Sequence, residues 1–377
     1  MNAVTVPEAY ADSKTGISRF GLVRALQHQV QAVGVTVIML LLFLVTGLHS
    51  PYFWQGTNLR VLAMNMSFTA IAGVGMAILI ISGNVDLSIG SILGVTAVLS
   101  GMLAKTTSAP LAFVGGIAVG GLVGAVNGVL VWNVSASPII ITLGVMTLLR
   151  GLIYVITGGE AITGVPTGFT NFANMSPGGL PMPVWFALGA ALLGFLFLTF
   201  TKAGRHVYAV GGSRDASRAA GIHVRRLVIG AFVVSGLLVG LAGVLESSLY
   251  TAPDETFGTG FELQVITAVI VGGVSFAGGE GGVIRAIIGV ALLQVVSGSV
   301  VAFNIDPNYA DILTGAILVL AVSLDQIVHR NRERFQKAMA MRDRARVLEE
   351  QRAVPGGDLD PVEAGEPLGT APEPRER

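Results

Sequence analysis

The chain has 377 residues, of which 52% are hydrophobic and 12% are charged, and its formal net charge is zero. Soluble domains carry about 25% charged residues, so the composition excludes an ordinary soluble domain and indicates a membrane protein. Cysteine is absent, which excludes disulfides, thiol chemistry and thiolate metal sites.

Residues 1–29 are polar and mixed in charge, too long and too charged for a simple signal peptide, and they predict an N-terminal cytoplasmic segment. Apolar segments long enough to cross a bilayer follow. They lie at about 30–48, 61–82, 88–104, 111–132, 138–157, 183–200, 227–249, 263–278, 283–303 and 309–327. We therefore predict an all-α polytopic membrane protein with about ten transmembrane helices, which form a transmembrane domain over residues 30–328.

Glycine and polar residues interrupt this apolar pattern at two places, ISGNVDLSIGS at 81–91 and GGVSFAGGEGGVIRAIIG at 272–289. Non-helical backbone at membrane depth is tolerated only where it is buried in protein or lines a wet cavity. Transporters place broken helices near their substrate path. Both breaks are therefore candidates for re-entrant or discontinuous helices, and two tight turns at the membrane surface are the alternative.

The segment 111–132 carries a glycine at every fourth residue. Such spacing makes a smooth groove along one helix face and favours close helix packing, with the lining of a translocation path as the alternative. Two further glycines repeat the spacing in the segment 227–249. The glycines are Gly116, Gly120, Gly124, Gly128, Gly236 and Gly240.

The loop 201–226 holds six of the 23 Lys and Arg residues and carries helix signals of its own. Ser213 stands where an N-cap is expected, RDASRAA favours a helix, and Gly221 supplies a C-terminal stop. Basic residues also precede the first apolar segment and follow the last, and in a ten-span chain all three groups fall on one side. The positive-inside rule then predicts cytoplasmic termini and a short cytoplasmic helix that a partner protein can hold.

After the last apolar segment, residues 329–352 predict a basic cytoplasmic helix, and residues 353–377 predict a disordered tail rich in Pro, Gly and acids. A long Gly- and Pro-rich link at 158–182 falls on the outer side.

Charged residues inside apolar segments are costly and are functional hypotheses by default. Asp86 is one, with capping of the following helix as the alternative. Arg150 either snorkels to the interface or pairs with a carboxylate, and Glu246 lies at a similar depth. The full set of intramembrane charges is Asp86, Arg150, Glu246, Arg285 and Asp311.

The chain lacks the pattern G-x-x-x-x-G-K-[ST] of an ATP-binding loop, and its five histidines have no metal-ligand spacing. We predict no catalytic residue, no metal site and no cofactor in this chain. Energy for uphill transport must therefore come from a partner or from an ion gradient.

Four ordered blocks resemble the membrane-spanning permease subunits of ribose-type sugar ABC importers, a group that includes ribose, xylose, rhamnose and autoinducer-2 permeases. The blocks are ISGNVDLSIGSILG, SPIIITLGVMTLLRGL, GRHVYAVGGSRDASRAAGIHV and GFELQVITAVIVGGVSFAGGEGG. Asn84 and Val85 stand where ribose permeases more often have Gly and Ile, as in the rhamnose and autoinducer-2 branch, and Glu280 replaces a common basic residue.

The resemblance implies a non-enzymatic, multi-pass permease of the inner membrane that carries a monosaccharide. A cytoplasmic ATPase would bind ATP and Mg²⁺, a periplasmic or lipid-anchored protein would deliver the sugar, and a second permease copy would complete a dimer. The coupling helix on the ATPase would comprise Ser213, Arg214, Asp215, Arg218, Ala219, Ala220 and Gly221. Neither the sugar nor the choice between homodimer and heterodimer follows from the sequence.

A neutral sugar needs a polar path rather than a charge relay. The polar residues in or beside the spans that would line this path are Asn65, Asn84, Asp86, Asn127 and Gln264. The rival hypothesis is a secondary transporter coupled to protons or sodium through Asp86, Glu246 or Asp311.

Overall fold

A computed structural model describes residues 33–134, 136–327 and 341, which form helices and their connections without a strand. The chain divides into one compact unit that ends at Gln326 and a second part that begins at Ile327. The predicted segments 1–29 and 353–377 lie outside the described residues, and Met341 alone is described within 329–352.

In this part of the chain, 8 helices are long and apolar enough to cross a membrane. They are α2 (Gly56–Ile81), α3 (Ile89–Thr106), α4 (Ala109–Asn133), α5 (Pro138–Thr157), α7 (Met182–Phe200), α10 (Val224–Tyr250), α12 (Val283–Ala302) and the helix Asn308–Ile327. Two shorter apolar helices are Val33–His49 and α11 (Phe261–Val271). The connections hold η1 (Pro51–Trp54), α6 (Thr167–Thr170), η2 (Pro177–Gly179), α8 (Lys202–Gly212) and α9 (Arg214–Ala219). The prediction of an all-helical polytopic membrane protein is confirmed.

The predicted span at 263–278 is wrong as a single helix. α11 has 11 residues and ends at Val271. At 1.5 Å per residue it is roughly 16 Å long, about half the thickness of the hydrocarbon core of a bilayer. Non-helical chain on either side of α11 completes this part of the fold.

The helix α2 lies at the centre of the unit, packed against α7, α10, α11 and α12. It is buried throughout from Ser67 to Ile81, whereas α5 and the helix Asn308–Ile327 direct most of their side chains outward. The outward side chains are largely Leu, Ile and Val, as suits a surface in contact with lipid. The polar features described below are therefore arranged around α2 rather than on the periphery.

The glycine groove of α4 packs against α10. A Cβ atom on Gly120 would meet the backbone of Gly236 and Gly240, and one on Gly124 would meet the backbone of Phe232. The interpretation of these glycines as a packing surface is confirmed, because the groove is filled by a neighbouring helix.

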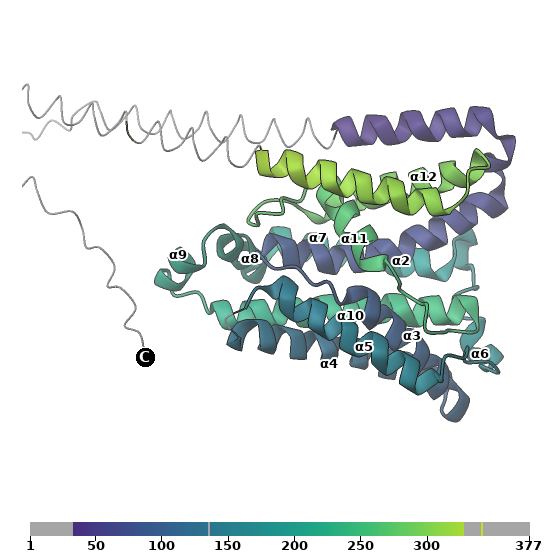
Figure 1. Cartoon of the computed structure of the whole chain (residues 1–377), viewed down its shortest axis with the longest axis horizontal. Helices are drawn as coiled ribbons and strands as arrows, with labels where there is room; N and C mark the ends of the chain where they lie inside the picture. The colour runs from purple at the N-terminus through teal and green to yellow at the C-terminus, as the bar shows by residue number, and fades with distance from the viewer. Residues whose placement is uncertain (1–32, 135, 328–340, 342–377) are drawn as a thin grey trace, which may run out of the picture. The chain divides into compact units, whose positions relative to one another are not determined.

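The helices α8 and α9 lie at one end of the bundle and α6 at the other (Figure 1). The connection that contains α6 packs onto the bundle through Phe169, whose side chain is fully buried. The backbone carbonyl of Phe169 accepts a hydrogen bond from Ser248 Oγ of α10 at 2.6 Å. We call these two ends the α9 end and the α6 end.

Candidate functional site

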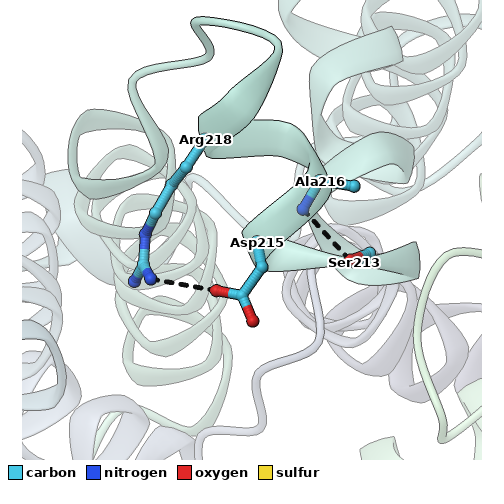
Figure 2. A network of polar contacts seen from close by, with 4 residues as sticks. All are labelled: Ser213, Asp215, Ala216 and Arg218. Atoms are coloured by element: carbon cyan, nitrogen blue, oxygen red, sulfur yellow. Dashed lines mark hydrogen bonds and ion pairs between the residues drawn. The ribbon is translucent and has the colours of Figure 1, made fainter. Parts of the chain in front are cut away.

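The predicted short helix in the loop 201–226 is α9, and its predicted cap is present. Ser213 Oγ accepts a hydrogen bond from the backbone N–H of Ala216 at 3.3 Å, and Asp215 pairs with Arg218 at 3.2 Å (Figure 2). Gly221 has a φ of 79°, a conformation that ends helices and favours glycine. The sequence did not predict α8, which precedes α9 and begins at an N-cap of its own, Thr201.

One face of α9 is held by the bundle and another is open. The guanidinium of Arg218 lies over the ring of Trp132, at the end of α4, with 5.6 Å between them. The side chains of Ala219 and Ala220 are exposed. These two small residues leave a surface that another backbone can approach closely.

Arg214 joins α9 to the first break, which comprises residues 82–88 between α2 and α3. Its Nη2 donates hydrogen bonds to Asn84 Oδ1 at 2.8 Å and to the Gly83 carbonyl at 3.3 Å. Burial, followed by the like charge of Arg218, lowers the pKa of the Arg214 guanidinium. Because arginine remains protonated in proteins, the contact is a charge-assisted one. Arg214 therefore ties α9 directly to the residues that follow α2.

The second break, residues 272–282 between α11 and α12, meets the first break and α8 in the same place. The Gly279 N–H donates to the Ile81 carbonyl at 2.9 Å. Gly211 of α8 fits between them, since a Cβ on it would meet the Ile81 carbonyl and the Gly279 nitrogen. We call this contact of Gly83, Gly211, Gly278 and Gly279 the glycine junction.

Two further side chains fix the second break. The Tyr208 hydroxyl of α8 donates to the Gly281 carbonyl at 3.1 Å, and burial raises the pKa of this phenol. Asp325, near the end of the helix Asn308–Ile327, accepts from the Phe276 N–H at 3.1 Å. The break is thus connected to α8 and to the last described helix.

The two breaks begin with the same backbone geometry. Gly83 N donates to the Ile80 carbonyl, as Gly273 N does to the Ile270 carbonyl, and both glycines have positive φ, 76° and 102°. Buried residues of the first break are Ser82, Asn84, Val85, Asp86 and Ser88. The first break is therefore a helix discontinuity buried within the protein, and its depth in the membrane stays a prediction.

Asp86, Ser88 and Asn127 form a fully buried polar cluster at the start of α3. Asp86 Oδ1 accepts hydrogen bonds from the N–H and the Oγ of Ser88, at 2.8 and 2.6 Å. Asn127 Nδ2 donates to Asp86 Oδ2 at 3.2 Å and to Ser88 Oγ at 2.7 Å. Asp86 thus orders the residue directly before α3, close to the capping role that the sequence allowed.

We expect Asp86→Asn to retain most uptake and Asp86→Ala to lose it. An amide still accepts from Ser88, and the buried Asn127 Oδ1, which has no partner, can turn toward the new N–H₂. Alanine leaves the buried donors of Ser88 and Asn127 unpaired, a cost of about 1–3 kcal/mol each. Thermal unfolding and uptake measured on both variants check this. Loss of uptake in folded Asp86→Asn would instead favour an ion-coupled carrier.

A third non-helical stretch, residues 251–260, returns from the end of α10 along α3. A Cβ on Gly101 would meet Pro253 Cγ at 2.9 Å, and a Cβ on Gly94 would meet the Phe257 carbonyl at 2.6 Å. The glycines of α3 therefore make room for a non-helical backbone made largely of turns, beside a helix long enough to span a membrane.

Arg150 of α5 supplies hydrogen bonds to this stretch. Its Nη1 donates to the carbonyls of Phe257 at 2.7 Å and Glu255 at 3.4 Å, groups that have no helical partner. The acidic side chain that interacts with Arg150 is Glu262. The suggested pair of Arg150 with Glu246 is wrong, because Arg150 is used to satisfy backbone carbonyls at membrane depth.

Glu246 instead lines a cavity of 290 Å³ at the α6 end of four helices. The lining residues are Asn65, Phe68 and Thr69 of α2, Glu246 and Tyr250 of α10, Phe261 and Gln264 of α11, and Gln294 and Ser297 of α12. The Tyr250 hydroxyl donates to Asn65 Oδ1 at 3.1 Å.

The five predicted path residues thus divide between two places. Asn65 and Gln264 meet in the cavity, whereas Asn84, Asp86 and Asn127 lie around the first break. Sequence reasoning missed the polar lining from α12, although Gln294 and Ser297 are three residues apart and share a helix face. Asp311 is exposed in the first turn of its helix, and Arg285 is the third residue of α12.

In the described part of the chain, eight apolar helices that include a largely buried α2, with two helix breaks that meet beside a capped surface helix, define a multi-pass membrane protein. The chain belongs to the family of branched-chain amino acid transport system permease components, whose model matches residues 58–322. The matched range includes both breaks, α9 and the cavity.

Three relatives have similar lengths and are transport permeases rather than enzymes. The D-allose transport system permease protein of Escherichia coli K12 is 32% identical over 79% of this chain and 92% of its own. The ribose import permease protein of the same strain is 34% identical over 77% of this chain and 92% of its own. The L-arabinose ABC transporter permease protein of Azospirillum brasilense is 34% identical over 81% of this chain and 90% of its own. The resemblance seen in the sequence blocks is confirmed.

Proposed function

We propose that the chain is the permease subunit of an ATP-binding-cassette importer that carries a monosaccharide across the inner membrane. The names of its relatives, permeases for D-allose, ribose and L-arabinose, support a sugar as the substrate. A separate cytoplasmic ATPase binds ATP and Mg²⁺, since this chain lacks the phosphate-binding pattern. A periplasmic or lipid-anchored binding protein delivers the sugar.

The observation that carries the proposal is the connection of α9 to both helix breaks. Arg214 of α9 bonds to the first break, and α8, directly before α9, contacts both breaks at Gly211. A partner that moves α9 therefore moves the ends of α2 and α11 together. This is the arrangement that rigid-body alternating access requires of a coupling helix.

The α9 end is the cytoplasmic side in this proposal. It carries the six basic residues of the loop 201–226, in agreement with the positive-inside rule. Both termini lie on the same side, and a second copy of the chain completes a homodimer. The cavity at the α6 end then faces the binding protein.

Ala220→Arg tests the coupling helix. We expect the variant to fold in the membrane but to lose co-purification with the ATPase and about tenfold or more of its uptake, because a long charged side chain blocks close approach to α9. Ala203→Arg is the matched control, since Ala203 is an exposed alanine of α8 outside the docking helix. Normal co-purification and uptake by Ala220→Arg would overturn the proposal.

A further inference from the structure

We propose that the cavity among α2, α10, α11 and α12 is a binding site for a neutral monosaccharide within the membrane domain itself. This inference rests on the proposed transport function and adds a site where the permease contacts its substrate. The cavity is open on one side and has a volume of 290 Å³. Pockets for small molecules have volumes of about 300–1,000 Å³, so the space suits a single small solute.

The lining has the chemistry that a polyhydroxylated solute needs. Three amides, from Asn65, Gln264 and Gln294, offer donors and acceptors side by side. The hydroxyls of Thr69, Tyr250 and Ser297 and the carboxyl of Glu246 add further partners for sugar hydroxyl groups. The rings of Phe68 and Phe261 supply apolar surface for the carbon skeleton.

The same lining does not suit an amino acid, the substrate in the family's description. A zwitterion brings a carboxylate, which is held best by a cationic side chain or another strong donor. The residues that line the cavity include Glu246 but no Lys or Arg. Nor does the cavity suit a metal ion, since the described residues contain no group of three or more potential ligands.

The cavity is connected to the glycine junction by continuous helices. α2 runs from Asn65 in the cavity wall to Ile81 at the junction, and α11 runs from Phe261 to the second break. A solute that holds α2 and α11 together at one end therefore acts on the two helices that lead into the breaks, and α8 and α9 contact those breaks at the other end. Substrate and ATPase thus act on opposite ends of shared helices.

Because the chain has no cysteine, a single introduced thiol reports directly on the cavity. We choose Ser297→Cys, which places the thiol in the cavity wall. Ser299→Cys is its control on the same helix, because Ser299 is buried and its hydroxyl bonds to Thr46 Oγ1 at 2.7 Å. Modification by a charged methanethiosulfonate is followed in the assembled complex in proteoliposomes. D-Ribose, D-allose, L-arabinose, glycerol and L-leucine are the probes.

We expect the thiol of Ser297→Cys to react and that of Ser299→Cys to be protected. At least one of the three sugars at twice its dissociation constant should slow the reaction about threefold, whereas glycerol and L-leucine should not. Gln264→Cys repeats the measurement from α11 if Ser297→Cys does not fold. An unreactive cavity thiol, protection by L-leucine, or no protection by any of the sugars would each overturn the inference.

A second variant tests the lining itself. Tyr250→Phe removes the hydroxyl that orders Asn65, and we expect the sugar concentration for half-protection to rise about tenfold. Tyr154→Phe is the control, because Tyr154 is 60% exposed on α5. Sugar protection should persist in Ala220→Arg, so loss of the coupling function and absence of the sugar site give different results. An unchanged half-protection in Tyr250→Phe would contradict the assigned role of the lining.

Discussion

Replacing Gly211 by alanine is expected to lower uptake about tenfold or more, whereas the same change at Gly212 is expected to leave uptake unchanged. A Cβ on Gly211 would overlap the Ile81 carbonyl and lie 2.6 Å from the Gly279 nitrogen, so the glycine junction must separate. Both of these atoms belong to the backbone, so rotation of a side chain cannot relieve the overlap. With α8 displaced from both breaks, α9 no longer moves α2 and α11 together, and we expect uptake to fall about tenfold or more.

Gly212 is a matched control because a Cβ on it would have nothing within 4 Å, and its φ is not positive. The measurements are ATP-dependent uptake and ATP hydrolysis by the assembled complex. Continued hydrolysis with little uptake in Gly211→Ala would show that the junction transmits the motion. Uptake equal to that of Gly212→Ala would show that the junction is incidental to transport.

Gly120→Ala is expected to lower the free energy of unfolding by about 2–3 kcal/mol, since overpacking of a tight interface costs up to about that amount. The added Cβ would meet the Gly236 carbonyl and lie 2.8 Å from the Gly240 Cα, so α4 and α10 must move apart. These two helices form the most extensive contact between helices in the described part of the chain. The whole groove from Gly116 to Gly128 would then lose contact.

Gly144→Ala on α5 is the control, because a Cβ there would have nothing within 4 Å. In an open helical position alanine is favoured over glycine by about 1 kcal/mol, so this change should be neutral or stabilising. Thermal unfolding of both purified variants in detergent gives the comparison. Equal stability of the two would contradict close packing of α4 on α10.

The sequence predicts the helices well because lipid enforces long apolar segments, and it predicts α9 because caps are local. Ser213 and Gly221 occupy the positions that their residue types indicated. The amphipathic helix α8 was missed because its residues were taken for part of a basic loop. For α8 and α9, the prediction depended only on local signals such as caps and charges close together in the sequence.

Tertiary contacts account for what the sequence left open. The cavity unites residues from Asn65 to Ser297, which no local pattern brings together. For Arg150 the sequence left both snorkelling and a carboxylate partner open. Its hydrogen-bond acceptors are instead the carbonyls of Glu255 and Phe257, which lie on non-helical chain far away in the sequence.

The stretch 251–260 and α11 together have a consequence for how the protein is made. α10 and α12 both run from the α9 end to the α6 end, so the chain between them must return through the bundle. It does so as non-helical backbone followed by a helix of 11 residues that is apolar but too short to span a bilayer by itself. In the folded chain this stretch packs on the glycine face of α3 and on the guanidinium of Arg150, and we expect it to enter the membrane by binding to them. The ribosome synthesises α3 and Arg150 before residues 251–271. The surface on which this stretch packs is therefore made before the stretch itself.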